Sequence, residues 1–307
     1  MRYLLFILLS ISTFAKEQYT FEGVFNDISA TQYQGMLILK NSAQMHLTEQ
    51  PLQSEYSHLL DSSLYDAMFA IQKDIKIRAQ KQGDKLVLTF YKDNELRPLI
   101  MLDAGHGGND PGAIAQSGLK EKHVTLNFSQ LLYKKLNSTL GEGIIQSRTR
   151  DQTITKYERL ESVIQKEPYY LISIHADSYT TPNAKGMGIL CLDDSQGSGQ
   201  SQEILKSHNL ETPTNTQSAK HIGNYILSRL KHTYHLHATS TTTSPLVILR
   251  SPLTTSILIE LGFLSHPVES KNLANTTYIA NLSDDISNAI LDYLISHEGI
   301  VPIKNLK

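Results

Sequence analysis

The stretch LIMLDAGHGG, residues 99–108, begins with four apolar residues and ends with a histidine set among glycines. A short apolar run of this kind is typical of a buried strand. Glycines let the backbone turn tightly and allow another group to approach closely. We therefore expect a strand that ends near residue 103 and presents His106 on the loop that follows it.

The pattern set by this stretch continues to the C-terminus, where apolar runs alternate with helical spacing. The expected strands are LIML, GIIQSRT, YYLISI, MGILCL, LVILR and SILI. The expected helices lie at about 121–136, 217–231 and near 282–294, where apolar residues recur at helical intervals. This alternation predicts an α/β domain over residues 97–298, with a mostly parallel central sheet flanked by helices on both faces.

Residues 16–96 differ from the region that follows. DIKIRAQ and KLVLTFY both alternate around the turn-like tetrad KQGD, which predicts a hairpin. SSLYDAMFAIQ, residues 62–72, has apolar residues at helical spacing. We expect a small N-terminal α+β unit, whose sequence indicates no chemistry and leaves its role open.

The N-terminus MRYLLFILLSISTFA, residues 1–15, has one basic residue, an apolar run and a small-x-small ending. This pattern is typical of a signal peptide and less so of a buried helix, and the run is short for a membrane anchor. We expect an exported protein of the periplasm or cell envelope, with no membrane span in its mature form and a short tail at 299–307. Cys191 is the only cysteine of the 307 residues, so no internal disulfide can form.

The net charge of −2, without a Lys/Arg-rich block, gives no indication of nucleic-acid binding. Chemistry is indicated instead by three polar residues that come after apolar runs: His175 and Glu260 follow theirs directly, and His106 follows LIML after a short glycine turn. In an open α/β sheet, ligands bind at the carboxyl ends of the strands, where these groups gather. Glu121 stands at the start of the following helix and can fold back towards His106.

Two imidazoles and one carboxylate form a three-ligand zinc set that leaves a fourth position for water. We predict His106, Glu121 and His175 as the metal ligands, and Glu260 as the residue that takes the water's proton and passes it to the leaving amine. Each residue alone has an ordinary structural explanation, such as a hydrogen-bonded histidine or a helix-start glutamate. Together at strand ends they favour a zinc hydrolase.

Four further residues are weaker candidates. Asp103 either orients His106 through its other ring nitrogen or caps a turn. Arg148 and Arg159 either meet carboxylates of the substrate or make structural pairs. Glu203, within the Gly/Ser-flanked segment 193–217, either belongs to a short self-inhibitory helix or lies in an ordinary loop.

Five motifs occur in the order MLDAGHGGNDPGAI, GLKEKHVTLN, SRTRD, ISIHADS and ILIELGFLSHPVE. In these motifs and their order, the chain resembles the zinc-dependent N-acetylmuramoyl-L-alanine amidases of the bacterial cell wall. The resemblance extends from about residue 98 to the C-terminal helix. The resemblance implies one zinc held by His106, Glu121 and His175, with Glu260 as the catalytic glutamate, which agrees with the assignment from strand ends.

The resemblance also implies a reaction: hydrolysis of the amide between the lactyl group of N-acetylmuramic acid and the L-alanine of the stem peptide. We expect a monomer that acts on peptidoglycan, in wall remodelling or daughter-cell separation, with a protein activator as a further expected partner. The alternatives are a zinc peptidase that cuts stem peptides or cross-links, and a wall-binding protein without activity.

Overall fold

The computed structural model describes residues 17–23, 25, 28–33, 36–41, 44–51, 57–62, 66–71, 75–91, 97–140, 143–180, 183–193, 199–211 and 216–301. The expected signal peptide and most of the expected C-terminal tail lie outside these residues. The chain divides into two compact units, residues 1–96 with 305–307 and residues 97–304. Among the described residues, no helix is both long and apolar enough to cross a bilayer.

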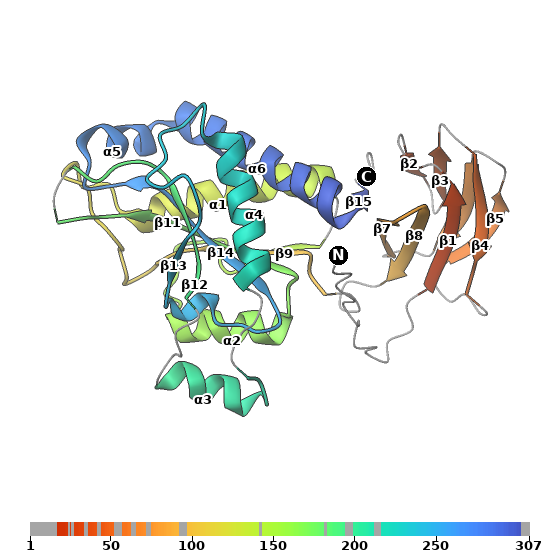
Figure 1. The fold of residues 1–307 in the computed structure, drawn as a ribbon, viewed down its shortest axis with the longest axis horizontal. Helices are drawn as coiled ribbons and strands as arrows, with labels where there is room; N and C mark the ends of the chain where they lie inside the picture. The colour runs from red at the N-terminus through yellow and green to blue at the C-terminus, as the bar shows by residue number, and fades with distance from the viewer. Residues whose placement is uncertain are drawn as a thin grey trace, which may run out of the picture. The chain divides into compact units, whose positions relative to one another are not determined.

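The described part of the N-terminal unit consists of antiparallel strands (Figure 1). These are β1 (Glu17–Gly23), β2 (Ile28–Tyr33), β3 (Met36–Asn41), β4 (Met45–Glu49), β5 (Ser57–Ser62), β6 (Asp66–Ile71), β7 (Lys76–Gln82) and β8 (Lys85–Tyr91). They form two sheets, in which the strands lie in the order β7-β8-β1-β4 and β2-β3-β6-β5. Phe69 of one sheet lies with its ring centroid 4.9 Å from Tyr19 and 5.2 Å from Phe90 of the other, so an aromatic core holds the two sheets together.

The predicted hairpin of this unit is confirmed by the pairing of β7 with β8 across a turn at Gly83 and Asp84. The predicted helix at 62–72 is wrong, because its described part includes strand β6, paired with β3 on one side and β5 on the other. Ala67 and Phe69 are buried while Met68 and Ala70 are partly exposed, an alternation with the period of a strand. A short apolar run fits either period, and here the pairing with neighbouring strands decides.

The second unit is built on a six-stranded sheet (Figure 1). Its strands are β9 (Ile100–Ala104), β10 (Ile144–Gln146), β11 (Tyr170–Asp177), β12 (Gly188–Leu192), β13 (Thr242–Ser244) and β14 (Thr255–Phe263). They lie in the order β10-β9-β11-β14-β12-β13, and only the β12–β14 pair is antiparallel. The short strand β15 (Ile300–Val301) follows the last helix. The mostly parallel sheet is therefore confirmed.

Helices cover both faces of this sheet, as the apolar runs predict. The helices are α1 (Glu121–Leu140), α2 (Lys156–Lys166), α3 (Gln200–Ser207), α4 (Thr216–Leu230), α5 (Pro267–Ala274) and α6 (Thr276–Glu298), with a 3₁₀ turn η1 (Val247–Leu249). Helices α1, α4 and α6 pack on one face of the sheet, and α2 with η1 packs on the other (Figure 1). Along β11, Leu171 packs into the core beneath α2, and Ile172 packs into the larger core on the other face of the sheet. Successive residues of this strand therefore contribute to the cores on opposite faces.

The strand predicted at LVILR is wrong, because these residues form η1 and not a strand. Ile248 and Leu249 are buried against Val163 of α2 and the underside of the sheet. The sheet position beside β12 is taken by β13, whose sequence Thr-Thr-Ser has no apolar run. A turn packed under a sheet buries apolar side chains as well as a strand does. An apolar run alone therefore does not distinguish a strand from such a turn.

Candidate metal centre

Three adjacent parallel strands bring the candidate residues to one edge of the sheet. β11 lies between β9 and β14, and His175 on β11 stands directly beside Glu260 on β14. His106 follows the end of β9 by two residues. Since parallel strands end on the same side, three segments far apart in the chain place their polar groups together.

In the loop after β9, one position has room only for glycine and the next residue has an uncommon backbone conformation. A Cβ atom at Gly105 would lie 2.4 Å from Cε1 and 2.5 Å from Nε2 of His175, so the imidazole ring rests directly on the glycine backbone. His106 itself has a φ of 59°, in the left-handed region that non-glycine residues seldom adopt. The glycine and the strained backbone together bring the two histidines within ring contact, with centroids 4.9 Å apart.

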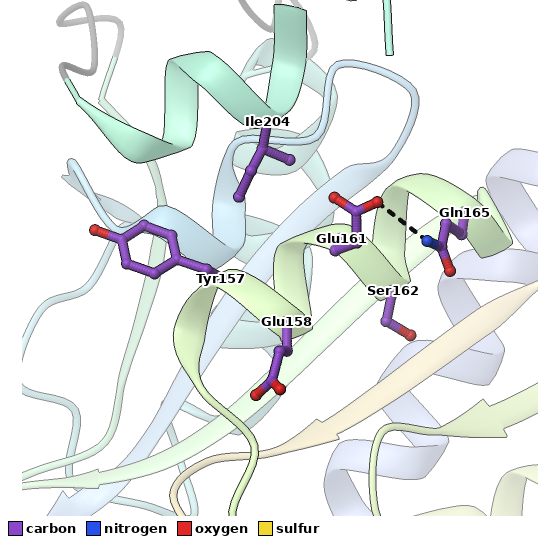
Figure 2. Close-up of a pocket in the computed structure, with 6 residues that line it drawn as sticks. All are labelled: Tyr157, Glu158, Glu161, Ser162, Gln165 and Ile204. Atoms are coloured by element: carbon purple, nitrogen blue, oxygen red, sulfur yellow. Dashed lines mark hydrogen bonds between the residues drawn. The ribbon is translucent and has the colours of Figure 1, made fainter. Parts of the chain in front are cut away.

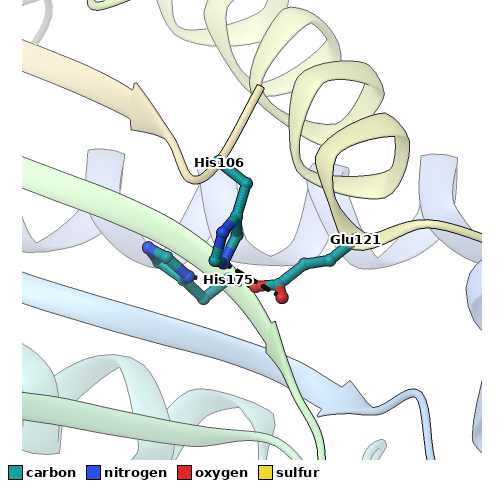
Figure 3. Close-up of side chains that lie close together, drawn as sticks. All are labelled: His106, Glu121 and His175. Atoms are coloured by element: carbon teal, nitrogen blue, oxygen red, sulfur yellow. Dashed lines mark hydrogen bonds and ion pairs between the residues drawn. The ribbon is translucent and has the colours of Figure 1, made fainter. Parts of the chain in front are cut away.

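Figure 3 shows the resulting group, in which His106, Glu121 and His175 point towards one another. One potential ligand atom from each lies within 4.8 Å of the others. Glu121 Oε2 lies 3.0 Å from Nε2 of His106, and Oε1 lies 3.0 Å from Nδ1 of His175. Two nitrogen donors and a carboxylate therefore converge on one point.

Glu121 is fixed in this position by the backbone around it. Its side chain is buried, and the N–H groups of Ala113 and Ala176 donate to Oε2 and Oε1 at 2.8 and 3.0 Å. Burial alone would raise the pKa of Glu121, but hydrogen bonds to the two histidines bring it well below the usual range. For His106, burial favours a lower pKa, but the hydrogen bond and charge of Glu121 raise it. The carboxylate is thus ionised, as a metal ligand must be.

The three residues fit a zinc ion by their chemistry and spacing. Imidazole and carboxylate are zinc ligands, and two ligands about 2.0 Å from one tetrahedral ion lie about 3.3 Å apart. The 3.0 Å separations observed are close to this value. With three protein ligands, the set leaves a fourth position open, which is typical of catalytic zinc sites.

Glu260 lies beside this group with a feature that a structural residue rarely has. Its Oε2 atom is buried and has no hydrogen-bond partner among the described residues. Burial raises the pKa of Glu260 well above the usual range, and the charges of Asp177 and Glu121 raise it further. An unpartnered buried carboxyl oxygen costs stability, and such groups concentrate at functional sites.

Asp103 does not contact His106, contrary to the prediction that it orients the ring, and it does not cap a turn. Its buried carboxylate accepts hydrogen bonds from Arg159 and from Ser173 Oγ, the latter at 2.8 Å. Burial favours a raised pKa for Asp103, but the Arg159 guanidinium holds it below the usual range. Asp103 thus belongs to a buried ion pair beneath the site.

The two arginines support the His106 loop from below, and neither is exposed to meet a substrate. Arg148 is 2% exposed and donates to the carbonyl oxygens of Ala104, Gly105 and Lys122 at 2.8–2.9 Å. Arg159 donates to the carbonyl oxygen of His106 at 2.6 Å. Of the two predicted roles, the structure supports structural pairing.

A contact that the sequence did not suggest lies on the outer side of His106. Asp110 Oδ2 is 2.8 Å from Nδ1 of His106, so it occupies the place predicted for Asp103. Asp110 follows His106 by four residues in the loop, whereas Asp103 precedes it in the strand. The turn between Gly107 and Asp110, closed by two backbone hydrogen bonds, brings the carboxylate back to the ring.

Glu203 is exposed on α3, and α3 packs against α2 through Leu205, Leu160 and Ile164. Figure 2 shows the pocket between these two helices, of about 340 Å³. It is lined by Tyr157, Glu158, Glu161, Ser162, Gln165 and Ile204, and by none of the candidate metal ligands. The described contacts of α3 therefore do not support a role for Glu203 in blocking the metal centre.

Comparison with known proteins agrees with this geometry. The family model for N-acetylmuramoyl-L-alanine amidases matches residues 100–292. AmiC of Neisseria meningitidis, an N-acetylmuramoyl-L-alanine amidase, is 31% identical over 224 residues, which are 66% of this chain and 54% of AmiC. AmiA of Salmonella typhimurium, named as the same kind of amidase, is 30% identical over 219 residues, 64% of this chain and 75% of AmiA.

Among solved structures, the CwlD amidase from Clostridioides difficile, in complex with the GerS lipoprotein, superposes with a TM-score of 0.53 at 25% identity. That match covers 64% of this chain and 97% of CwlD. The chain spans about half the length of the AmiC protein, so the comparison covers part of each protein and not the whole of either. The family model covers more than half of the chain and includes all four residues of the site, and the chain therefore belongs to the N-acetylmuramoyl-L-alanine amidase family.

Proposed function

We propose that the protein hydrolyses the amide bond between the lactyl group of N-acetylmuramic acid and the L-alanine of the peptidoglycan stem peptide. In this proposal one zinc ion is held by His106, Glu121 and His175, and Glu260 transfers the proton. The observation that carries it is the buried, unpartnered Oε2 of Glu260 beside a converging His-Glu-His group. Membership of the amidase family supplies the identity of the bond.

Glu260 has the properties that the proton transfer needs. Burial raises the pKa of Glu260 above its usual range, and a carboxyl group with a raised pKa holds a proton more readily than an ordinary one, which favours its use as a general base and acid. It takes the proton of the attacking water and gives it to the nitrogen of L-alanine as the amide C–N bond breaks. The products are the lactyl carboxylate and a stem peptide with a free amino terminus.

Zinc, when bound, lowers the pKa of water from about 15.7 to about 7 and polarises the carbonyl group of the amide. The protein's own contribution is to hold the ligands rigidly. Glu121 is fixed by two backbone N–H groups, and His175 is held against Gly105. Rigid placement keeps the carboxylate of Glu260 and the reacting groups in reach of one another.

The surroundings of the reaction form part of the proposal. Residues 1–15 have the pattern of a signal peptide, and the substrate lies in the cell wall, so we place the protein in the periplasm or cell envelope. The cellular role is wall remodelling or daughter-cell separation. We include a protein activator as a partner, because the similar CwlD amidase was solved in complex with a lipoprotein.

Mass spectrometry of purified peptidoglycan digested with and without a chelator tests the proposal. We expect free stem peptides beginning in L-alanine, and only where zinc is available. Peptides with other new amino termini would identify a peptidase that cuts within the stem or cross-link. Intact peptidoglycan after incubation with the zinc-loaded protein would indicate a wall-binding protein and contradict the proposed hydrolysis.

A further inference from the structure

The two ring nitrogens of His106 face two different carboxylates. Nε2 lies 3.0 Å from Oε2 of Glu121, on the side where the metal ligands converge. Nδ1 lies 2.8 Å from Oδ2 of Asp110, on the opposite side of the ring. An imidazole placed in this way has one nitrogen for a metal and the other for a hydrogen bond.

Asp110 is itself held in place by the loop. Its Oδ1 accepts a hydrogen bond from the N–H of Gly112 at 3.0 Å. Its backbone exchanges two hydrogen bonds with Gly107, at 2.9 and 3.1 Å. The carboxylate is thus oriented by the same turn that carries His106, although its side chain is 59% exposed.

We propose that Asp110 is a positioning residue for the metal centre: it accepts the Nδ1–H proton of His106 and so keeps the Nε2 lone pair directed at the metal. The inference rests on the zinc site of the proposed function. Carboxylates that hold the second nitrogen of a metal-bound histidine fix its tautomer and ring orientation, and they raise its basicity as a ligand.

A second carboxylate, Asp151 in the segment between β10 and α2, contacts the same loop and provides a matched control. Asp151 accepts hydrogen bonds from the N–H of Gly108 at 2.6 Å and from Nζ of Lys122 at 2.7 Å. It therefore anchors the loop through its backbone, while its described contacts do not include either histidine ring. Asp110→Ala and Asp151→Ala separate orientation of the ring from anchoring of the loop.

Zinc affinity of the full chain, measured by competition with a chelator, is the first test. We expect Asp110→Ala to weaken binding by about 10- to 100-fold, the usual effect of losing such a partner, and Asp151→Ala by less than about threefold. Asp110→Asn is expected to fall between the wild type and Asp110→Ala. Its amide oxygen still accepts the proton but carries no charge. Thermal unfolding of the metal-free variants checks that all of them are folded.

Nuclear magnetic resonance of the zinc-loaded protein gives a reading that a merely structural role would not change. We expect the wild type to show a slowly exchanging Nδ1–H proton for His106. This signal should be lost or exchange rapidly in Asp110→Ala and should persist in Asp151→Ala.

Three outcomes distinguish the possible failures. Absence of zinc binding by the wild type would overturn the proposed metal centre, and this inference with it. Zinc affinity of Asp110→Ala equal to that of the wild type would overturn the inference alone. Equal losses in Asp110→Ala and Asp151→Ala would show that loop anchoring, and not orientation of the ring, determines affinity, and would also overturn it.

Discussion

Glu260 has a buried carboxyl oxygen that is costly to the fold, and in the proposed function the same side chain transfers the proton. Its Oε2 is buried without a partner, and the strand register sets it beside His175. Among the described residues no hydrogen bond stabilises this oxygen, so hydrogen bonding within the fold does not account for a carboxyl group at this position. We therefore make predictions for Glu260 on activity and on stability separately.

Glu260→Gln keeps the size of the side chain but cannot accept the proton of water. We expect zinc binding to be retained and hydrolysis of peptidoglycan to fall by a factor of about 10²–10⁴, the usual contribution of a positioned general base. Metal content and release of stem peptides measure the two effects. His175→Ala serves as the contrast, since it should lose both. Near-wild-type hydrolysis by Glu260→Gln would remove the assignment of Glu260 as the base.

The raised pKa of Glu260 predicts a dependence of stability on pH in the metal-free protein. Because the pKa in the folded state lies above the unfolded value of about 4.3, the protonated form stabilises the fold. That contribution is complete below the unfolded pKa and is lost as pH rises through the folded pKa. Glu260→Gln, which has no charge to bury, should therefore unfold at a higher temperature than the wild type near neutral pH, with the difference shrinking in acid. Melting curves across this range check the prediction, and a difference independent of pH would contradict it.

Gly105 tests how tightly the histidines are packed. The Cβ of Gly105→Ala would lie 2.4–2.8 Å from three atoms of the His175 ring, so the ring must move. Because a displacement of about 1 Å in an active site costs about 100-fold in rate, we expect kcat/KM to fall by about that factor. Gly188→Ala is the control, since its Cβ would meet nothing within 4 Å and should leave kcat/KM unchanged.

At the scale of the element, β11 connects the core to the site. Ile172 and Ile174 are fully buried in the larger core, and His175 follows directly at the carboxyl edge. The helix α2 adds a second connection: its capping box at Thr155 and Glu158 fixes its first turn, and Arg159 reaches from there to the His106 carbonyl. The position of the site therefore depends on packing as well as on its own residues.

Ile172→Ala separates stability from chemistry within β11. Truncating this fully buried side chain leaves a cavity, and we expect a loss of about 2–5 kcal/mol in the free energy of unfolding. Denaturant unfolding of the metal-free protein measures it. Ile295→Ala, at a position 44% exposed on α6, should cost less than about 0.5 kcal/mol. Equal losses at the two positions would contradict the predicted role of β11 in the core.

At the scale of the whole molecule, the proposed metal joins segments that are distant in the chain. His106 lies after β9, Glu121 begins α1, and His175 lies on β11, so the three ligands converge only in the folded second unit. A metal that binds the folded state and not the unfolded one stabilises the fold.

Removal of zinc should therefore lower the melting temperature as well as abolish activity. At a free zinc concentration of about 100 times Kd, linkage predicts about 2.7 kcal/mol of stabilisation. Differential scanning calorimetry with zinc and with a chelator measures the shift. His175→Ala, which lacks one ligand, should show little shift. A zinc-induced shift in this variant as large as in the wild type would place the bound metal elsewhere.

The sequence by itself determined the α/β class of the second unit, its mostly parallel sheet and the candidate residues that gather at the edge of that sheet. These features follow from local patterns: long helical periodicities, apolar runs, and polar residues placed directly after strands. The strand β6 within the predicted helix 62–72 and the turn η1 in LVILR were decided by tertiary structure. Short apolar runs can be buried in more than one conformation, and neighbouring segments select one.

The same distinction holds within the site. The sequence indicated His106, Glu121, His175 and Glu260 because each stands at or just after the end of a predicted strand, or at the start of a predicted helix. Only the tertiary structure revealed that Asp103 pairs with Arg159 while Asp110 faces the His106 ring. A polar side chain's partner depends on which distant segments and loop turns approach it, and the local sequence pattern around Asp103 and Asp110 does not specify those approaches.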